Sequence, residues 1–93
     1  MKTKKELIQL FNGGKIESVA TYSNDYYRAC HIVEVVHGID DKVFGYIELP
    51  NGYDKDGFRT YEKTFFFVKL NYENDSFRVH GETWDLNNFI RKF

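Results

Sequence analysis

Apolar and polar residues alternate with a period of two along most of this chain, and a helical period is found only near its two ends. At the N-terminal end, Thr3 and Glu6 have the spacing of a helix capping box. The apolar stripe that follows consists of Leu7, Ile8, Leu10 and Phe11, and it stops at Asn12-Gly13-Gly14. This pattern predicts a first helix of about two turns, which ends at the glycine pair and packs on the rest of the chain.

Three strand-like segments come next, at residues 15–22, 26–36 and 43–49. The middle segment has apolar residues on both of its faces, which predicts a central strand that is covered on both sides for part of its length. Gly45 interrupts the third segment, and a glycine inside a strand marks a bulge or a point of close packing. Residues 50–57 contain the single proline together with glycines and aspartates, which predicts an exposed loop.

The longest alternating pattern covers residues 58–84 and predicts a hairpin with its turn at Asn74-Asp75. On the apolar face the predicted pairs are Tyr72 with Phe77, Leu70 with Val79, Val68 with Gly81 and Phe66 with Thr83. On the other face, which mixes aromatic and charged residues, they are Asn71 with Arg78, Lys69 with His80, Phe67 with Glu82 and Phe65 with Trp84. Because a slip of one residue would exchange the two faces, the pattern favours this register.

A second helical period closes the chain. Its apolar stripe is Leu86, Phe89, Ile90 and Phe93, which predicts a helix over residues 85–92. Since the connections are short, we expect consecutive strands to be antiparallel neighbours. The predicted fold is therefore α+β, a single domain of residues 1–93 in which a five-stranded antiparallel meander sheet carries a short N-terminal and a short C-terminal helix.

The composition favours a sheet and argues against several functions. Of the 93 residues, 18% are aromatic, mostly Phe and Tyr, which prefer pleated and half-buried surfaces. The net charge is −1, whereas a globally basic nucleic-acid binder would carry a clear positive excess. The lone cysteine, Cys30, excludes an intramolecular disulfide. The chain has neither a signal-peptide core nor an apolar run of ~20 residues, so we expect a cytoplasmic protein that does not enter a membrane.

The soft and borderline metal ligands do not have the spacing of a metal site. They are Cys30, His31, His37 and His80. Cys30 and His31 are adjacent in a predicted strand, so their side chains point to opposite faces. The turn Asp54-Lys55-Asp56-Gly57 has part of the EF-hand pattern, but Gly52 and Lys63 occupy the positions of two essential ligands. We therefore expect no metal and no cofactor.

Catalytic motifs are equally scarce. None of the serines lies in a nucleophile elbow, and the glycines form no phosphate-binding loop. Cys30 beside His80 is a conceivable nucleophile and base across two strands, but no motif supports this pair. We expect a protein that is not an enzyme.

The mixed face of the predicted hairpin, with the loop before it, is the candidate functional surface. Its residues are Tyr53, Asp54, Arg59, Tyr61, Lys63, Phe65, Phe67, Lys69, Arg78 and His80, next to Trp84. Exposed aromatic and arginine side chains are enriched in protein interfaces, and the same mixture of rings and cations also binds single-stranded nucleic acids. If a terminal helix instead covers Phe65, Phe67 and Trp84, the hairpin is scaffold and recognition belongs to the loops.

Protein binding is the function that this surface favours. We expect a non-enzymatic module that engages another protein and occludes a surface of that partner. The alternative is a single-stranded nucleic-acid-binding protein that uses the same residues. In size and composition the chain resembles small accessory proteins of bacteria and phages, including inhibitors of host defence enzymes, but no family motif identifies it. The sequence leaves the oligomeric state open.

Overall fold

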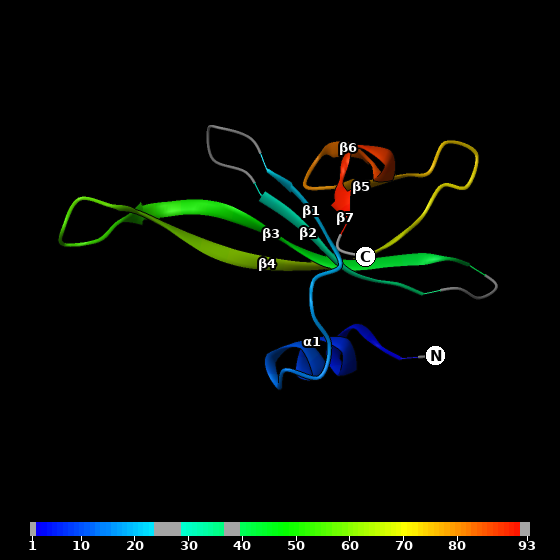
Figure 1. Ribbon diagram of the computed structural model, residues 1–93, viewed down its shortest axis with the longest axis horizontal. Helices are drawn as coiled ribbons and strands as arrows, with labels where there is room; N and C mark the ends of the chain where they lie inside the picture. Colours follow the sequence, from blue (N-terminus) through cyan, green and yellow to red (C-terminus); the bar gives the residue numbers. More distant parts are fainter. Residues whose placement is uncertain (1, 24–28, 37–39, 92–93) are drawn as a thin grey trace.

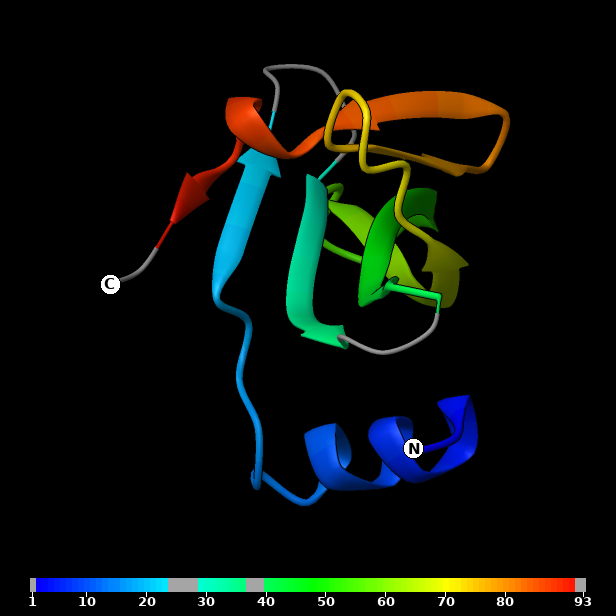
Figure 2. The ribbon, with the colours of Figure 1, turned by 90° about the vertical axis from the view of Figure 1, so that its right-hand side faces the viewer.

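The computed structural model describes residues 2–23, 29–36 and 40–91. Within these ranges the chain forms α1 (Lys4–Asn12), β1 (Ala20–Ser23), β2 (Ala29–Val36), β3 (Lys42–Tyr53), β4 (Arg59–Lys69), β5 (Ser76–Val79), β6 (Glu82–Asp85), the 3₁₀ turn η1 (Leu86–Asn88) and β7 (Ile90–Arg91). The elements form three layers, with α1 on one face of the main sheet and the β5–β6 hairpin with η1 on the other (Figures 1 and 2). The fold is α+β with antiparallel strands, as predicted.

The first helix confirms the prediction from the capping box. The backbone N–H of Glu6 donates to the Thr3 hydroxyl at 3.2 Å, and Gly13 caps the C-terminal end. Leu7 points into the protein and is completely buried. A helix this short is marginal in isolation, so its stability depends on the packing of this apolar stripe.

Strands β1 to β4 form an antiparallel meander in the order β4-β3-β2-β1, and the two-residue β7 pairs with the outer side of β1. The predicted single meander of five consecutive strands is therefore wrong, because the fifth consecutive strand does not pair with the fourth. Within the described chain β4 is an edge strand, and its one partner in the sheet is β3.

The long hairpin over residues 58–84 is replaced by two shorter ones. The chain leaves β4 through a turn closed by the Asn71–Ser76 bridge, and β5 then pairs with β6, so that Phe77 lies opposite Trp84. The physical reason is the turn at His80-Gly81, where both residues have positive φ (55° and 76°). Two such residues form the tight hairpin turn that matches the twist of the flanking strands. Val79 consequently pairs with Glu82, and the predicted register of β4 with the following strand is wrong.

The β3–β4 hairpin is longer than predicted. Strand β3 continues to Tyr53, through the first half of the predicted loop at residues 50–57, and a bulge near Asn51 accommodates Pro50 in the ladder. A proline is tolerated here because the bulge interrupts the regular ladder. The loop itself shrinks to the turn between Tyr53 and Arg59.

The predicted C-terminal helix is wrong in the described residues. The Asp85 carboxylate accepts a hydrogen bond from the Asn87 N–H at 2.9 Å, which supports only one 3₁₀ turn, and Phe89 is already extended. Leu86 and Phe89 enter the core, but Ile90 is 79% exposed, so the helical stripe does not face one surface. Phe93, the last member of that stripe, lies outside the described residues.

The sheet is covered on both faces, as the apolar pattern of the second predicted strand, residues 26–36, indicated. Residues 26–28 of this predicted strand lie outside the described residues. On the α1 side, the core residues are Leu7, Val33, Phe44 and Tyr46. On the β5–β6 side, the cluster includes Cys30, Ile32, Val43, Ile47, Phe66, Phe77, Trp84, Leu86 and Phe89. A bulge after Ile32 shifts the alternation of β2 and turns Val33 and Val36 towards α1, although the regular alternation would separate them.

Gly45 is the point of close packing that its position in the strand indicated. A Cβ atom there would lie 2.0 Å from the His31 carbonyl oxygen and 2.8 Å from the ring of Phe66. We predict that Gly45→Ala lowers the free energy of unfolding by about 3 kcal/mol or more, because the clash with the backbone cannot be relieved by a rotamer change. Urea unfolding followed by tryptophan fluorescence measures this loss.

Gly57→Ala is the matched control for this prediction. Gly57 has a positive φ of 84° but open space around its Cα, so the substitution should cost only about 1–2 kcal/mol of backbone strain. Equal losses in the two variants would contradict close packing at Gly45.

Candidate functional site

The candidate surface residues lie on both sides of the main sheet. The odd-numbered residues of β4, from Arg59 to Lys69, share the face that carries α1, as the buried contacts of Phe65 and Phe67 show. Arg78 and His80 belong to the β5–β6 hairpin, which covers the other face. Trp84 is buried in the cluster beneath that hairpin. The ten residues therefore do not form one continuous surface.

Helix α1 covers the two central aromatic residues of β4. The ring of Phe11 makes an edge contact with Phe65 at 5.7 Å between centroids, and Phe65 also stacks on Phe44 at 5.9 Å. Phe67 makes an edge contact with Phe44 and is half-buried in the same cluster. This is the alternative predicted from the sequence, in which a terminal helix covers Phe65 and Phe67. Phe65 and Phe67 are part of the scaffold.

Two lysines of this face lie at the rim of the covered region. The Lys63 ammonium is 5.4 Å from the ring centroid of Phe11 and 5.1 Å from that of Tyr46, within the range of cation–π attraction. Lys69 pairs with Asp40 at 3.3 Å, and both side chains are largely exposed. Exposed ion pairs of this kind contribute little to stability, so Lys69 remains accessible to a partner.

The distal half of the β3–β4 hairpin projects beyond both covering layers (Figure 1). We call residues 50–61 the arm. The molecule measures 47 × 29 × 27 Å, and the arm extends along its longest axis. Three of the six large hydrophobic residues found exposed in the described chain belong to the arm, namely Tyr53 (68%), Phe58 (71%) and Tyr61 (46%).

Local hydrogen bonds fix the geometry of the arm. The Asp54 carboxylate accepts from the N–H groups of Asp56 and Phe58, both at 2.9 Å, and so holds the turn. The Thr60 hydroxyl donates to the Asn51 side-chain oxygen at 2.6 Å across the two strands. Asp54, a candidate contact residue in the sequence, therefore has a structural role in this turn.

Arg59 lies against Tyr53 at the base of the turn. Its Nη2 donates to the Tyr53 hydroxyl at 3.3 Å, and its guanidinium carbon is 5.7 Å from the ring centroid. The hydrogen bond raises the pKa of Arg59 above its usual value. These contacts restrict the Tyr53 ring, so a partner would meet an aromatic side chain whose orientation is already limited.

Cross-strand pairing places four of the predicted residues in one stripe. Tyr53 is opposite Arg59 and Pro50 is opposite Tyr61, and directly opposite residues project from the same face. Lys63 continues this face towards α1. The stripe of Tyr53, Arg59, Tyr61 and Lys63 is the part of the candidate surface that the structure brings together. The surface predicted from the sequence did not include Phe58 and Pro50, because neither follows the alternation of the hairpin.

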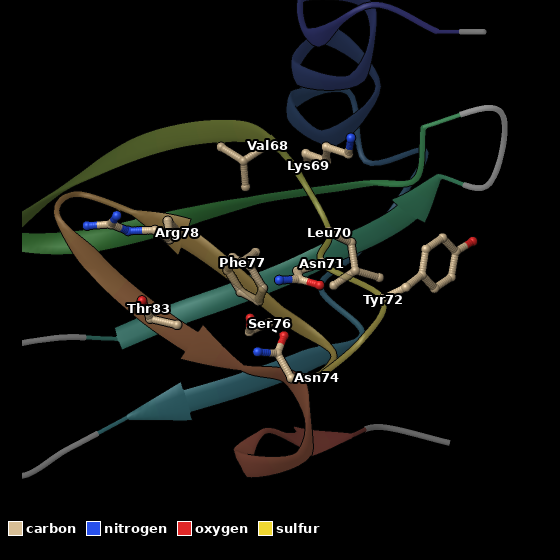
Figure 3. Close-up of a pocket in the computed structure, with 10 residues that line it drawn as sticks. All are labelled: Val68, Lys69, Leu70, Asn71, Tyr72, Asn74, Ser76, Phe77, Arg78 and Thr83. Carbon is tan, nitrogen blue, oxygen red and sulfur yellow. Dashed lines mark hydrogen bonds between the residues drawn. The ribbon is translucent and has the colours of Figure 1, made fainter.

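A groove of about 750 Å³ lies where β4 ends and the chain crosses to β5 (Figure 3). Val68, Lys69 and Leu70 lie along one part of its wall, and Phe77 and Arg78 lie along another. The exposed side chains of Lys69 and Arg78 give this groove a basic character. It is a broad depression open to solvent, and the predicted Arg78 belongs to it and not to the arm.

The residues considered for catalysis and metal binding are not assembled into a site. Cys30 is completely buried, whereas His80 is exposed at the β5–β6 turn, so the two do not share an accessible surface. Within the described residues no three His, Cys, Asp or Glu side chains are grouped to hold a metal ion. His37 lies outside those residues. No helix in the described ranges is long and apolar enough to cross a membrane.

One polar cluster was not expected from the sequence. The ring of His31 stacks on Tyr46 at 4.4 Å, its Nδ1 lies 3.2 Å from the Thr21 hydroxyl, and its Nε2 lies 3.4 Å from a Glu48 carboxylate oxygen. The three polar residues come from β1, β2 and β3, and only their register in the sheet brings them together. The cluster ties three strands at the centre of the sheet.

Burial raises the pKa of the Cys30 thiol from 9.0 to about 12. We predict that the native protein resists alkylation by iodoacetamide at pH 8, because the thiolate is the reactive form and the sulfur is inaccessible. Since the folded-state pKa is above the unfolded value, the stability contributed by this thiol should be present below pH 9 and lost as the pH rises towards 12. Mass spectrometry of the protein alkylated with and without urea measures the labelling of Cys30. Rapid labelling of the folded chain would contradict the prediction that the native thiol resists alkylation.

The arm and the basic groove are thus the accessible features to which the candidate residues contribute. Their function has to be inferred from the side chains themselves. No protein-family model matches the chain, and no curated protein or solved structure shows significant similarity to it.

Proposed function

We propose that the chain is a non-enzymatic protein-binding module that contacts its partner through the arm. The observation that carries this proposal is the exposure of Tyr53, Phe58 and Tyr61 on a hairpin with a fixed turn that projects beyond both cores. Neither core cluster includes any of these three rings. Their burial in a complex would therefore add hydrophobic area without disturbing the fold.

The chemistry of the arm supports a protein partner. Tyrosine and arginine are enriched at the energetically dominant positions of protein interfaces, since they combine a large contact area with a hydrogen-bonding group. Tyr53 and Arg59 provide such a pair on one face of the arm. Because the turn is fixed before binding, the conformational entropy lost on association is small. The partner would be affected by occlusion of its surface, as expected for a small accessory or inhibitor protein.

A single-stranded nucleic acid is a weaker candidate. Phe65 and Phe67, the rings proposed to stack on bases, are half-buried under α1. The arm carries Lys55 and Arg59 against Asp54 and Asp56, two positive and two negative charges that sum to zero. A neutral arm offers no electrostatic attraction to phosphates.

We predict that Tyr53→Ala and Tyr61→Ala each weaken binding to the protein partner by about 30-fold, corresponding to roughly 2 kcal/mol for a central interface residue. The partner is first captured from a lysate of the encoding cell with the immobilised chain and then purified for calorimetry. Glu62→Ala is the matched control, because Glu62 is exposed on the neighbouring position but points to the opposite face of the strand. Unchanged affinity of both tyrosine variants would overturn the proposal.

Salt dependence separates the two partner classes. We expect less than about a tenfold change in affinity between 50 and 500 mM NaCl, because a contact centred on aromatic residues releases few counterions. A nucleic-acid complex with several phosphate contacts would lose affinity steeply over this range. Nuclease treatment of the captured material provides the second readout, and loss of binding after that treatment would favour nucleic acid.

A further inference from the structure

Strand β4 has one edge that no other strand of the described chain occupies. Leu70 continues its ladder, and its N–H donates to the Asp41 carbonyl at 2.9 Å. Hydrogen-bonded positions alternate along an antiparallel pair, so Thr64, Phe66 and Val68 bond to β3. Lys63, Phe65, Phe67 and Lys69 therefore direct their N–H and C=O groups away from the sheet. No hydrogen bond found elsewhere in the described backbone involves these four residues.

The central part of this edge, between Lys63 and Lys69, lacks the features that usually prevent pairing with another strand. Residues 64–68, Thr-Phe-Phe-Phe-Val, contain no charge, no proline and no bulge. Edge strands in natural proteins are commonly protected by one of these devices or by a covering segment. Here a second cavity, of about 290 Å³, lies along the segment.

The cavity is bounded from both sides of the sheet. Lys4 of α1 lines it together with residues 64–68, and so do Arg78, Val79 and His80 of the β5–β6 hairpin. Since α1 and the hairpin lie on opposite faces of the sheet (Figure 2), a cavity lined by both reaches the edge of β4, and Ile47 and Leu49 of β3 extend it over the sheet. It shares Val68 and Arg78 with the basic groove, so the two hollows border each other near the end of β4.

We propose that this edge is a second interaction site, which accepts an extended acidic segment of another protein by β-strand addition. The main-chain groups of Lys63, Phe65, Phe67 and Lys69 supply the hydrogen bonds of the new ladder. Side chains of the added segment alternate between the two faces, and those that flank Phe66 and Val68 enter the cavity. The site shares only Lys63 with the stripe of Tyr53, Arg59, Tyr61 and Lys63, and it uses the main chain of that residue.

The charges around the edge select the occupant. Lys4, Lys63, Lys69 and Arg78 are exposed cations at or beside the edge. The acidic residues there are Glu62, Glu48, which lies opposite Lys63 in the ladder, and Asp40, which is paired with Lys69. A strand with glutamate or aspartate at alternate positions would place carboxylates near these cations, whereas a basic strand would be repelled.

A second copy of this chain fits the edge poorly. In the antiparallel pairing centred on Phe66, which overlaps the whole apolar segment, Lys63 of one copy lies opposite Lys69 of the other. This like-charge contact occurs twice because of the two-fold symmetry, and directly opposed like charges destabilise a ladder. The terminal lysines thus disfavour self-pairing and leave the edge open to an acidic strand.

The test uses the full chain labelled with ¹⁵N and two blocked seven-residue peptides, one alternating valine with glutamate and the other alternating valine with lysine. We predict that the glutamate peptide slows amide exchange of Lys63, Phe65, Phe67 and Lys69 by about tenfold at saturation, since these N–H groups become hydrogen-bonded. The lysine peptide should leave their exchange unchanged. Nuclear Overhauser contacts between peptide and β4 backbone protons identify the added strand directly.

Lys63→Pro and Lys63→Ala form a matched pair of variants. Both remove the cation, but only proline removes the outward N–H, and it spares the hydrogen bonds to β3. We expect binding of the glutamate peptide to fall by roughly tenfold or more in Lys63→Pro and only by about two- to fivefold in Lys63→Ala. If Lys63→Pro fails to fold, the amide-exchange data on the unmodified chain still decide whether the glutamate peptide adds to the edge of β4.

Three results would overturn the proposal. They are unchanged exchange at the four amides at millimolar glutamate peptide, equal protection by the lysine peptide, and protection in the free protein that grows with its own concentration. The last result would assign the edge to a second copy. Tyr53→Ala should bind the glutamate peptide normally, so failure at the edge and failure of the proposed arm function are separable.

Discussion

The stacking of Phe66 on Gly45 is the contact on which the layered structure depends. These residues are opposite each other on β4 and β3, and the absence of a side chain on Gly45 lets the Phe66 ring lie against the sheet. Phe77 of β5 stacks on Phe66 at 5.6 Å, and Phe89 packs on Phe77 at 6.0 Å. The second layer is thus held to the sheet by a column of rings that begins at a glycine. A larger residue at this position would displace the whole column.

The local parts of the fold were predictable because their causes lie close together in the sequence. The Thr3 cap, the stop at Gly13 and the special role of Gly45 each follow from a few neighbouring residues. The hairpin after β4 was mispredicted because its apolar alternation is compatible with two pairings, and the decisive signal was the His80-Gly81 turn. The C-terminal stripe has a helical period, yet the chain becomes extended at Phe89 after the single 3₁₀ turn capped by Asp85, and Phe89 packs in the core.

The candidate site shows the same difference between local and long-range causes. Alternation along β4 correctly grouped Arg59, Tyr61 and Lys63, since it depends only on strand geometry. It could not separate them from Arg78, because the side of the sheet on which the next hairpin packs is a long-range property. Nor could it show that α1 covers Phe65, as two amphipathic segments were available to cover two faces. Phe58 lies beyond the regular pattern, and only the structure shows it as an exposed ring on the projecting arm (Figure 1).

Strand β4 therefore has different environments along its length, and this explains how one strand can serve scaffold and surface. Near Phe65 and Phe66 both of its faces are covered, by α1 and by the β5–β6 hairpin, so its side chains stabilise the fold. Towards Arg59 neither layer reaches it, so the side chains are available for contact. Where its faces are covered, its outer edge has no partner strand in the described chain. The proposed side-chain site and the proposed main-chain site consequently occupy different parts of the same strand, and a partner at either would not compete for the residues that hold the core together.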